Sequence, residues 1–481
     1  MTENPAGRLA SGPGKGPDAP PWQSLPPSLI WILALAVTAS LGLLGWLEVQ
    51  SSTGAPVALT IAMLAAFAVT CVVRLEAAFL CLLILTPFSV QFVIPGTGSA
   101  LQIPTEPMLF LALGVWLLRS LARGCHTVAQ PALIGSLFLA LLSCILSIVD
   151  TDFRFNAVKA TLNASWYGLY GVFLLNNLSR RNSIKALIHA WVWPALAIVA
   201  FSAWNVMTGN YNRWGGYFFA EPFFYDHGTF SAYLSFICAL SLALSLELNG
   251  PARAAFIMIA GITGGQVILS LTRGAWLGLA ALLPFLGISY GRRLLRPGNV
   301  GLIAFAACLV ALLVMLTGSE RDIEKHTGTI TEVGYQSNFE RLNRWYAGYQ
   351  MFLSDPINGI GYGTYQDYYF NFRRQALSTD QSRQRMGIHS EYLRVLAETG
   401  IVGALAATLS FLILTMVAWR AIRRTTDPLI RGVAVGMSGG LVTYLVHALV
   451  NNYIEFDKAA IPVWTAIGAL GAIERRQRRT D

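Results

Sequence analysis

The sequence predicts an all-α fold, a polytopic bundle of about 12–14 transmembrane helices with one large periplasmic loop that contains short helices. Two observations predict it. Hydrophobic residues make up 54% of the 481 residues and charged residues only 12%, with a mean hydropathy of +0.53, whereas globular chains are usually about 25% charged. The apolar residues also form blocks of about 18 or more residues, the length that crosses a bilayer. A water-soluble chain of this length could not cover its surface with so few charges.

Roughly fourteen apolar segments follow one another along the chain. They lie approximately at residues 28–47, 56–73, 77–94, 106–122, 131–149, 157–178, 185–207, 229–247, 253–270, 275–290, 300–317, 390–419, 430–450 and 458–473. The segments predict five regions. These are a disordered, Gly/Pro-rich cytoplasmic tail at 1–27, an N-terminal transmembrane bundle at 28–317, a large periplasmic loop at 318–388, C-terminal transmembrane helices at 389–473 and a basic cytoplasmic tail at 474–481.

The arginines and lysines predict the orientation of the bundle. If the N-terminus is inside and the segments alternate, the short outside loops carry only Arg154, Lys159, Arg213 and Arg273. Because positive charge gathers in cytoplasmic loops, this asymmetry predicts cytoplasmic termini and an external long loop. The net charge of +9 then reflects orientation, and no nucleic-acid partner is predicted. The inside loops carry Arg74, Arg119, Arg123, Arg180, Arg181, Lys185, Arg253, Arg292, Arg293, Arg296, Arg420, Arg423, Arg424, Arg431 and the tail ERRQRRTD.

Several patterns that suggest other chemistry are weak here. The six cysteines lie in apolar segments or in loops predicted to be cytoplasmic and form no CxxC, so neither a disulfide framework nor a metal knuckle is predicted. Asp150 and Asp152 form a DxD pattern, which we interpret as a solvated helix end. Gly359, Gly361 and Gly363 lack the lysine and the preceding strand of a P-loop, and we expect them to permit a tight backbone path. No metal and no cofactor is predicted.

Polar groups collect on the predicted outer face. Arg213 lies in the aromatic-rich stretch NRWGGYFFAEPFFYDHG, and Arg273 interrupts a long apolar run in ILSLTRGAWLGLAALL. A cation at such depth usually faces a polar cavity or a partner. Arg213 could instead anchor a helix end, and Arg273 could be the charge of a tight turn, but we favour a functional role for both. We interpret His227 and His447 as structural.

One further histidine, His389, lies where a membrane helix would leave the lipid, at the start of GIHSEYLRVLAETGIVGAL. Guanidinium groups match phosphate oxygens in a bidentate way and keep their charge. An imidazole with a pKa near 6.5 can accept a proton from a hydroxyl group. Fixed arginines around a single histidine therefore fit glycosyl transfer from a polyprenyl-diphosphate sugar, without nucleotide or metal.

Motifs in a fixed order between residues 200 and 420 carry a resemblance to a known family. They are Arg213 and Gly216 with the following EP; SLTRG from Ser270 to Gly274; Arg341, Arg344–Trp345, Pro356, Gly359, Gly361 and Gly363; and HSEYLRVLAETGIVG from His389 through Glu398 and Gly400 to Gly403. Their order and spacing resemble the O-antigen ligase and polymerase superfamily of bacterial envelope proteins.

The resemblance implies an inverting, metal-independent transfer of a lipid-linked glycan at the periplasmic face of the bacterial inner membrane. It implies that Arg213 and Arg273 bind the diphosphate and that His389 is catalytic. The implied partners are an undecaprenyl diphosphate-linked donor, a glycan or lipid A-core acceptor and membrane lipids, and a chain-length regulator is left open. Further candidate substrate contacts are Arg341, Arg344, Glu221, Tyr392 and Arg394.

Two choices stay open. A polymerase would join one lipid-linked repeat to another, and a ligase would move the chain to a different acceptor. The family often has PN where this chain has Glu221–Pro222, which leans towards a polymerase or exopolysaccharide assembly. The other class is a flippase of lipid-linked oligosaccharides. The sequence has no convincing inverted repeat, and its polar residues gather on one face, whereas transporter sites lie near the midplane.

Overall fold

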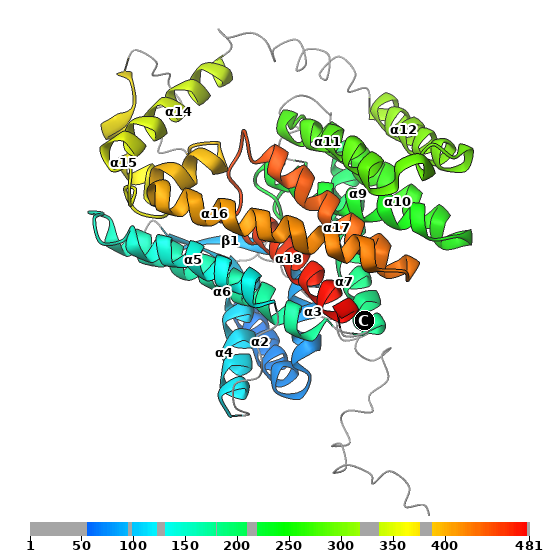
Figure 1. Cartoon of the computed structure of the whole chain (residues 1–481), viewed down its shortest axis with the longest axis horizontal. Helices are drawn as coiled ribbons and strands as arrows, with labels where there is room; N and C mark the ends of the chain where they lie inside the picture. The colour runs from blue at the N-terminus through cyan, green and yellow to red at the C-terminus, as the bar shows by residue number, and fades with distance from the viewer. Residues whose placement is uncertain are drawn as a thin grey trace, which may run out of the picture.

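The computed structural model describes residues 55–94, 99–122, 130–178, 180–208, 219–317, 336–375 and 387–478, and this part of the chain is almost entirely helical, as predicted (Figure 1). The predicted tail at 1–27, the first predicted span at 28–47 and Arg213 lie outside the described residues. The elements are α2 (Ala55–Val73), α3 (Leu75–Leu85), η2 (Thr86–Phe88), β1 (Val90–Ile94), β2 (Ser99–Ile103), α4 (Thr105–Ala122), α5 (Pro131–Leu146), α6 (Arg154–Asn177), α7 (Arg181–Thr208), α9 (His227–Glu247), α10 (Gly250–Leu269), α11 (Arg273–Tyr290), η3 (Gly291–Arg293), α12 (Pro297–Thr317), α14 (Gln336–Ser354), α15 (Tyr365–Phe372), α16 (Glu391–Arg424), α17 (Pro428–His447) and α18 (Asp457–Arg478).

The protein is a multi-pass membrane protein. Within the described ranges, seven helices are long and apolar enough to cross a bilayer, namely Thr105–Ala122, Arg181–Thr208, His227–Glu247, Gly250–Leu269, Arg273–Arg293, Glu391–Arg424 and Pro428–His447. Shorter apolar helices lie at Leu64–Val73, Leu75–Phe88, Pro131–Leu146 and Pro297–Leu312. The long apolar run around Arg273 forms two helices, α10 and α11, that meet at Ser270–Thr272.

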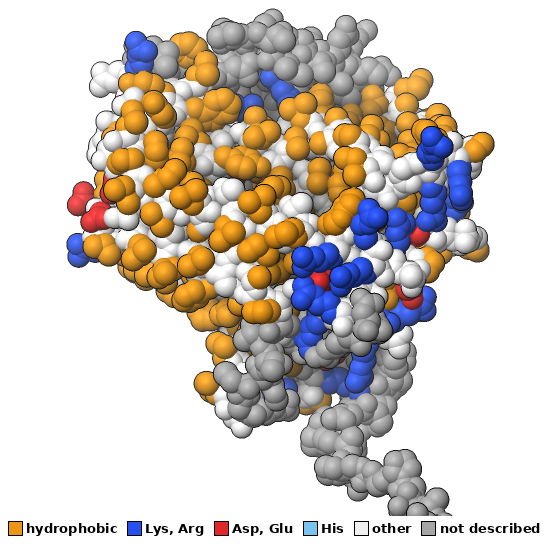
Figure 2. Space-filling model, in the orientation of Figure 1, with side chains coloured by type: hydrophobic (Ala, Val, Ile, Leu, Met, Phe, Trp, Pro, Cys, Tyr) orange, Lys and Arg blue, Asp and Glu red, His pale blue; other side chains and the backbone are white. Residues whose placement is uncertain are grey.

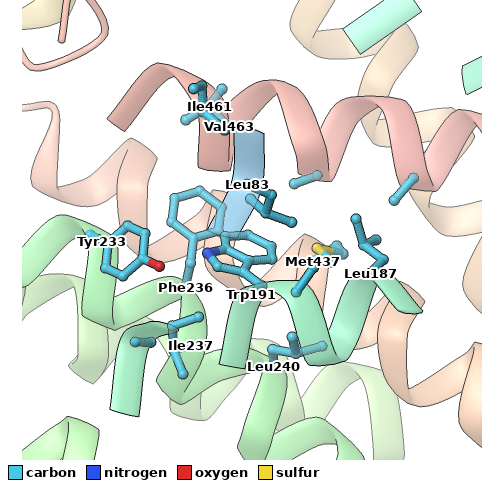
Figure 3. Packing of buried hydrophobic residues seen from close by; sticks show 14 of the residues in the cluster. Leu83, Leu187, Trp191, Tyr233, Phe236, Ile237, Leu240, Met437, Ile461 and Val463 are labelled. Carbon is cyan, nitrogen blue, oxygen red and sulfur yellow. The ribbon is translucent and has the colours of Figure 1, made fainter. Parts of the chain in front are cut away.

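Helix α9 is the centre of the bundle and packs against α10, α11, α17 and α18. It is apolar on all sides, and 94% of its span lies buried inside the protein, as expected for a helix without a polar face. Gly436 and Gly440 of α17 allow close approach, because a Cβ on either would collide with Leu240 or Phe236 of α9. Figure 3 shows this core, where side chains from α3, α7, α9, α17 and α18 interdigitate.

The two ends of α9 differ in chemistry. At its C-terminal end, Glu247 accepts hydrogen bonds from Arg431 and, at 3.2 Å, from Arg293. This group of charged side chains belongs to a basic region on the side of the molecule where α16 ends (Figure 2). Apolar side chains cover much of the rest of the face shown there. A helix of 21 residues is about 30 Å long, close to the thickness of a bilayer core. Asp226 and His227, at the other end, therefore lie on the opposite side of the bundle.

One predicted span is shorter than expected. The segment predicted at 77–94 is helical only to Leu85, followed by η2 and an antiparallel hairpin in which Val90 pairs with Ile103. Pro87 explains the break, because proline has no N–H to donate and disfavours helical geometry in the residue before it. Hydropathy alone does not separate an apolar strand from an apolar helix.

Helix α16 is broken at Gly400, whose φ of +59° is not helical. The segment 356–361 fills the break. The carbonyls of Ala397 and Glu398 accept from the N–H groups of Ile360 and Gly361, both at 3.1 Å, and Ile401 N donates to Pro356 O at 2.9 Å. In an unbroken helix, Ile401 would donate to Ala397. The tight path predicted for the glycines is confirmed, since Gly359, Gly361 and Gly363 all have positive φ.

Candidate functional site

Helix α14, α16 and the segment after α17 hold His389 in place. Its backbone N–H donates to Asn452 Oδ1 at 3.0 Å, and its carbonyl accepts from Trp345 Nε1 of α14 at 3.3 Å. Ser390, the next residue, caps α16 by accepting from Leu393 N at 3.4 Å. The backbone of His389 has φ +55°, an unusual conformation for a residue other than glycine. These contacts fix the direction in which its imidazole points.

The imidazole of His389 is oriented by an amide. Its Nδ1 donates to Asn451 Oδ1 at 3.1 Å, which leaves Nε2 as the nitrogen with a free lone pair. Burial and the nearby guanidinium groups of Arg344 and Arg341 lower the pKa of His389 to about 4, against the opposing effects of Asn451 and the Asp226 carboxylate. The ring is therefore neutral near pH 7 and able to accept a proton.

Two arginines of α14 lie on the side of this helix that faces His389. Arg344 is buried, with its Nη2 3.5 Å from Glu340 Oε2, and its carbonyl accepts from the Tyr365 hydroxyl at 2.8 Å. Arg341, three residues earlier and thus on the same face, is half-buried. Its charge acts on the imidazoles of His227, His389 and His447. Helix α14 thus brings positive charge from the long loop to the end of the bundle.

Arg273 is the first residue of α11, where the helix N-terminus adds its own partial positive charge. The preceding residue, Thr272, donates to the carbonyl of His227 at 3.3 Å. The following residue, Gly274, lies against His447, and a Cβ there would be 3.1 Å from Asn451 Nδ2. Asn451 therefore contacts both the start of the Arg273 helix and the ring of His389, so these two predicted residues lie in one neighbourhood.

The start of α9 completes this neighbourhood. Asp226 caps the helix by accepting from Thr229 N at 2.7 Å and Thr229 Oγ1 at 3.0 Å, and His227 Nδ1 lies 3.7 Å from its other oxygen. His447 is 1% exposed, and its ring packs edge-on against Tyr453 at 5.3 Å. We name this set of residues the outer-end cluster, after the orientation that the charge pattern of the sequence predicts. It consists of Asp226, His227, Arg273, Arg341, Arg344, His389, His447, Asn451 and Asn452.

A buried lysine holds the segment that leads into α9. Lys458 Nζ donates to the carbonyls of Ser89, at 2.7 Å, and Phe223, and lies 4.9 Å from the ring centre of Phe224. Asp457 accepts from Ser89 Oγ at 2.5 Å. These contacts join α18, the end of η2 and the segment before Asp226, so the position of the α9 start is set by charged groups inside the protein.

Comparison with protein families identifies the part of the chain that contains four of the nine residues of the outer-end cluster. The family model described as O-antigen ligase matches residues 254–408. This match supports membership of the O-antigen ligase and polymerase superfamily. The matched O-antigen ligase domain includes Arg273, Arg341, Arg344 and His389. A comparison with curated proteins found no match.

The O-antigen ligase domain also contains Arg394, a predicted substrate contact, but the structure surrounds its guanidinium with protein. Arg394 is 2% exposed and lies 2.5 Å from Glu391, 2.8 Å from Glu398 and 3.2 Å from Glu455. Its guanidinium also stacks over the ring of Tyr362 at 4.8 Å. This geometry supports a role for Arg394 in holding the first half of α16 against Tyr362 and against Glu455 in the segment after α17.

The other predicted contacts lie in different surroundings. Tyr392 is half-exposed on α16, and its hydroxyl donates to Leu445 O at 3.0 Å. Glu221 is exposed in the turn before α9. Arg213, the second predicted diphosphate ligand, lies outside the described residues. The carboxylate of Asp150, in the DxD pattern, accepts from Asn358 Nδ2 at 3.2 Å.

The sequence motifs do not point to Asn451, Asn452 or Asp226, and they predict structural roles for His227 and His447. A signal was present for the two amides. They follow directly on an apolar helix in HALVNNY, and adjacent asparagines at the end of a span are too polar to face lipid. Asp226 resembles an ordinary N-cap, and only the fold places it near His389.

Proposed function

We propose that this protein is a glycosyltransferase that moves a glycan from a polyprenyl diphosphate to an acceptor hydroxyl at the periplasmic face of the bacterial inner membrane. It would act as a polysaccharide polymerase or an O-antigen ligase, with inversion and without a metal ion. The observation that carries the proposal is the environment of His389, a neutral imidazole beside Arg341 and Arg344 that shares Asn451 with the start of the Arg273 helix. Membership of the O-antigen ligase superfamily supports it.

The arginines would bind the diphosphate. Their charge persists at any physiological pH, and the planar guanidinium matches two phosphate oxygens at once. When the bond between the sugar and the diphosphate breaks, negative charge grows on the leaving oxygen. Arg273 at the α11 N-terminus and Arg341, with Arg213 as a further proposed ligand, would stabilise that charge in the transition state. A fixed array of cations supplies here what metal ions supply in other transferases.

His389 would accept the proton of the acceptor. Its Nε2 takes the hydroxyl proton, the acceptor oxygen forms a bond to the anomeric carbon, and the polyprenyl diphosphate departs with the electron pair of the broken bond. A single displacement of this kind inverts the configuration at the anomeric carbon. The imidazole is neutral at working pH, so it is always available in the form that accepts a proton.

The test is glycan transfer by purified protein in liposomes that contain a lipid-linked donor. Replacing His389 by alanine is expected to reduce transfer by a factor of about 10²–10⁴, the usual contribution of a general base. His189→Ala is the control, because His189 is bonded to Trp193 on α7 and is not part of the outer-end cluster. Full transfer by a folded His389→Ala protein would refute the catalytic role.

Two acceptors in the same assay separate the remaining choices. Elongation of a second lipid-linked repeat indicates a polymerase, and modification of lipid A core indicates a ligase. Movement of the donor between leaflets without any new glycosidic bond would instead indicate a flippase. The polar cluster lies at one end of the bundle, whereas transporter sites lie near the midplane, so we expect bond formation.

A further inference from the structure

A second polar site lies at the opposite end of the bundle from His389. A cavity of about 230 Å³ opens between the end of α11, the end of α16 and the start of α17. Its lining combines two guanidinium groups, one hydroxyl and three apolar side chains. The lining residues are Ile288, Ser289, Trp419, Ile422, Arg423 and Arg431.

The charges in this cavity are not balanced by nearby acids. Arg431 is paired with Glu247 and also donates to Ser289 O at 3.2 Å. Glu247 is shared, because Arg293 lies 3.2 Å from its other oxygen, so one carboxylate serves two guanidinium groups. Arg423 stacks over the ring of Trp419 at 5.1 Å, and no carboxylate pairs with it in the ranges that the structure describes. The cavity therefore carries an excess of positive charge.

Two of the apolar side chains that line the cavity are exposed at the surface of the protein. Ile288 is 72% exposed and Trp419 47% exposed, on helices that cross the membrane. Tryptophan is enriched where hydrocarbon meets headgroups. The guanidinium groups of Arg423 and Arg431, with exposed apolar side chains beside them, match a molecule with an anionic head and an apolar tail.

We propose that this cavity binds the phosphate-bearing headgroup of an anionic membrane phospholipid. The guanidinium groups of Arg423 and Arg431 would contact the phosphate oxygens, the Ser289 hydroxyl would reach the headgroup, and the acyl chains would lie along Ile288 and Trp419. The cavity is smaller than the roughly 300–1,000 Å³ of most small-molecule sites, so it suits a headgroup and not a glycan. It lies at the other end of α9 from the outer-end cluster and so is a separate site.

A lipid bound in this cavity would also affect the other end of the bundle. The three helices around the cavity carry members of the outer-end cluster at their far ends, namely Arg273 at the start of α11, His389 just before α16 and His447 at the end of α17. A lipid bound to all three helices at one end would favour the packed arrangement at the other. Since it binds the folded state, it raises the unfolding temperature of the protein.

The experiment is native mass spectrometry and thermal unfolding of the purified full chain in detergent. The probes are phosphatidylglycerol, phosphatidylcholine, glycerol 3-phosphate and inorganic phosphate. We expect phosphatidylglycerol to remain bound and to raise the unfolding temperature, and the other three probes to do neither. Arg423→Gln should weaken phosphatidylglycerol binding by about five-fold or more, because one basic contact with an anionic lipid is lost. Trp419→Ala should also weaken it.

Arg424→Gln is the matched control. It removes the same charge at the neighbouring position, which does not line the cavity, and it should bind phosphatidylglycerol as the wild type does. Equal binding by Arg423→Gln and wild type would overturn the site. Equal loss in both variants would show a diffuse charge effect and would also overturn it. Protection by inorganic phosphate as strong as that by phosphatidylglycerol would show a simple anion site and exclude the lipid. Glycan transfer is not measured, so the outcome is independent of the proposed function.

Discussion

His389 is a histidine whose surroundings oppose its protonation. Burial and two guanidinium groups act in the same direction, and one amide and one more distant carboxylate act against them. The balance distinguishes this residue from an exposed histidine, which is half protonated at about pH 6.5. For a proton acceptor close to a diphosphate site, this means that Arg341, one of the arginines proposed to bind the donor, also helps to keep the base neutral.

The pH dependence of transfer follows from this environment. The pKa of His389 is lowered to about 4, so its neutral form persists well below pH 6.5. We expect kcat/KM for transfer to be nearly constant from about pH 8 to about 5.5 and to fall with a midpoint near pH 4, since kcat/KM reports the free enzyme. The unfolded chain takes up the proton near pH 6.5, so the stability contributed by this residue declines between about pH 6.5 and 4.

Asn451→Asp provides the control for this profile. A carboxylate 3.1 Å from Nδ1 favours the protonated ring, so the falling limb should move to higher pH. Asn451→Ala adds no charge and should not move it upward. If kcat/KM of the wild type fell with a midpoint near pH 6.5, the lowered pKa of His389 would be contradicted.

Replacing Arg273 by lysine tests whether transfer needs the bidentate geometry of a guanidinium group or only a positive charge. Arg273→Lys keeps the charge but loses bidentate geometry, and we expect kcat for glycan transfer to fall by about 10²-fold, as when one transition-state donor is removed. Arg253→Lys at the opposite end of the bundle is the control, with little expected change. Nearly normal turnover in folded Arg273→Lys would assign Arg273 a structural role.

At the scale of elements, the broken helix α16 explains how a membrane helix can carry a site at its mouth. A regular helix would have no room for the segment 356–361, which carries the loop from α14 to α15 onto the bundle. The break redirects backbone hydrogen bonds without leaving these groups unpaired. Beside it, Arg394 forms ion pairs with three carboxylates. Helix α14, with Arg341 and Arg344, is held in position next to His389 by these contacts.

Gly400 is the residue on which the break depends. A Cβ at Gly400 would collide with the carbonyl of Ile357. Its φ of 59° and ψ of −162° are essentially restricted to glycine and cost another residue about 1–3 kcal/mol before any collision. Gly400→Ala should therefore lower the unfolding temperature strongly or prevent folding, as judged by gel filtration and thermal unfolding. Gly287→Ala in α11 is the control, because no atom lies within 4 Å of the added Cβ. It should be neutral or slightly stabilising. Equal unfolding temperatures for the two variants would contradict the placement of the segment 356–361 in the break at Gly400.

At the scale of the whole molecule, charge divides the bundle into two unlike ends. One end carries arginines around Glu247 and the lipid cavity, and the other carries the outer-end cluster. The separation of about 30 Å along α9 equals one bilayer core. The excess of basic residues predicts that the first end is cytoplasmic, which puts His389 on the periplasmic side.

Labelling with a membrane-impermeant maleimide checks this orientation. In a variant without the natural cysteines, Gln366→Cys, exposed on α15, should react in cells whose outer membrane alone is permeabilised. Arg424→Cys, exposed at the end of α16, should react only after the inner membrane is opened as well. The reverse pattern would place the candidate site in the cytoplasm and contradict the proposed function.

The sequence by itself determined the helical membrane fold and carried the resemblance to the O-antigen ligase family. Hydropathy is a sum over neighbouring residues, so contiguous apolar runs such as those of α9, α10 and α17 could be found without any knowledge of their partners. The order of motifs around Arg273, Arg341 and His389 was likewise readable along the chain.

Only the tertiary structure decided what each polar residue faces. It separated Arg394, surrounded by three carboxylates, from Arg341, which lies near His389, although both are arginines on helices next to the same site. It introduced Asn451 and His447 into that neighbourhood and formed a hairpin where an apolar helix was predicted. Such contacts join residues that are far apart in sequence, and the partner of a charged group is set by packing geometry, which no local pattern encodes.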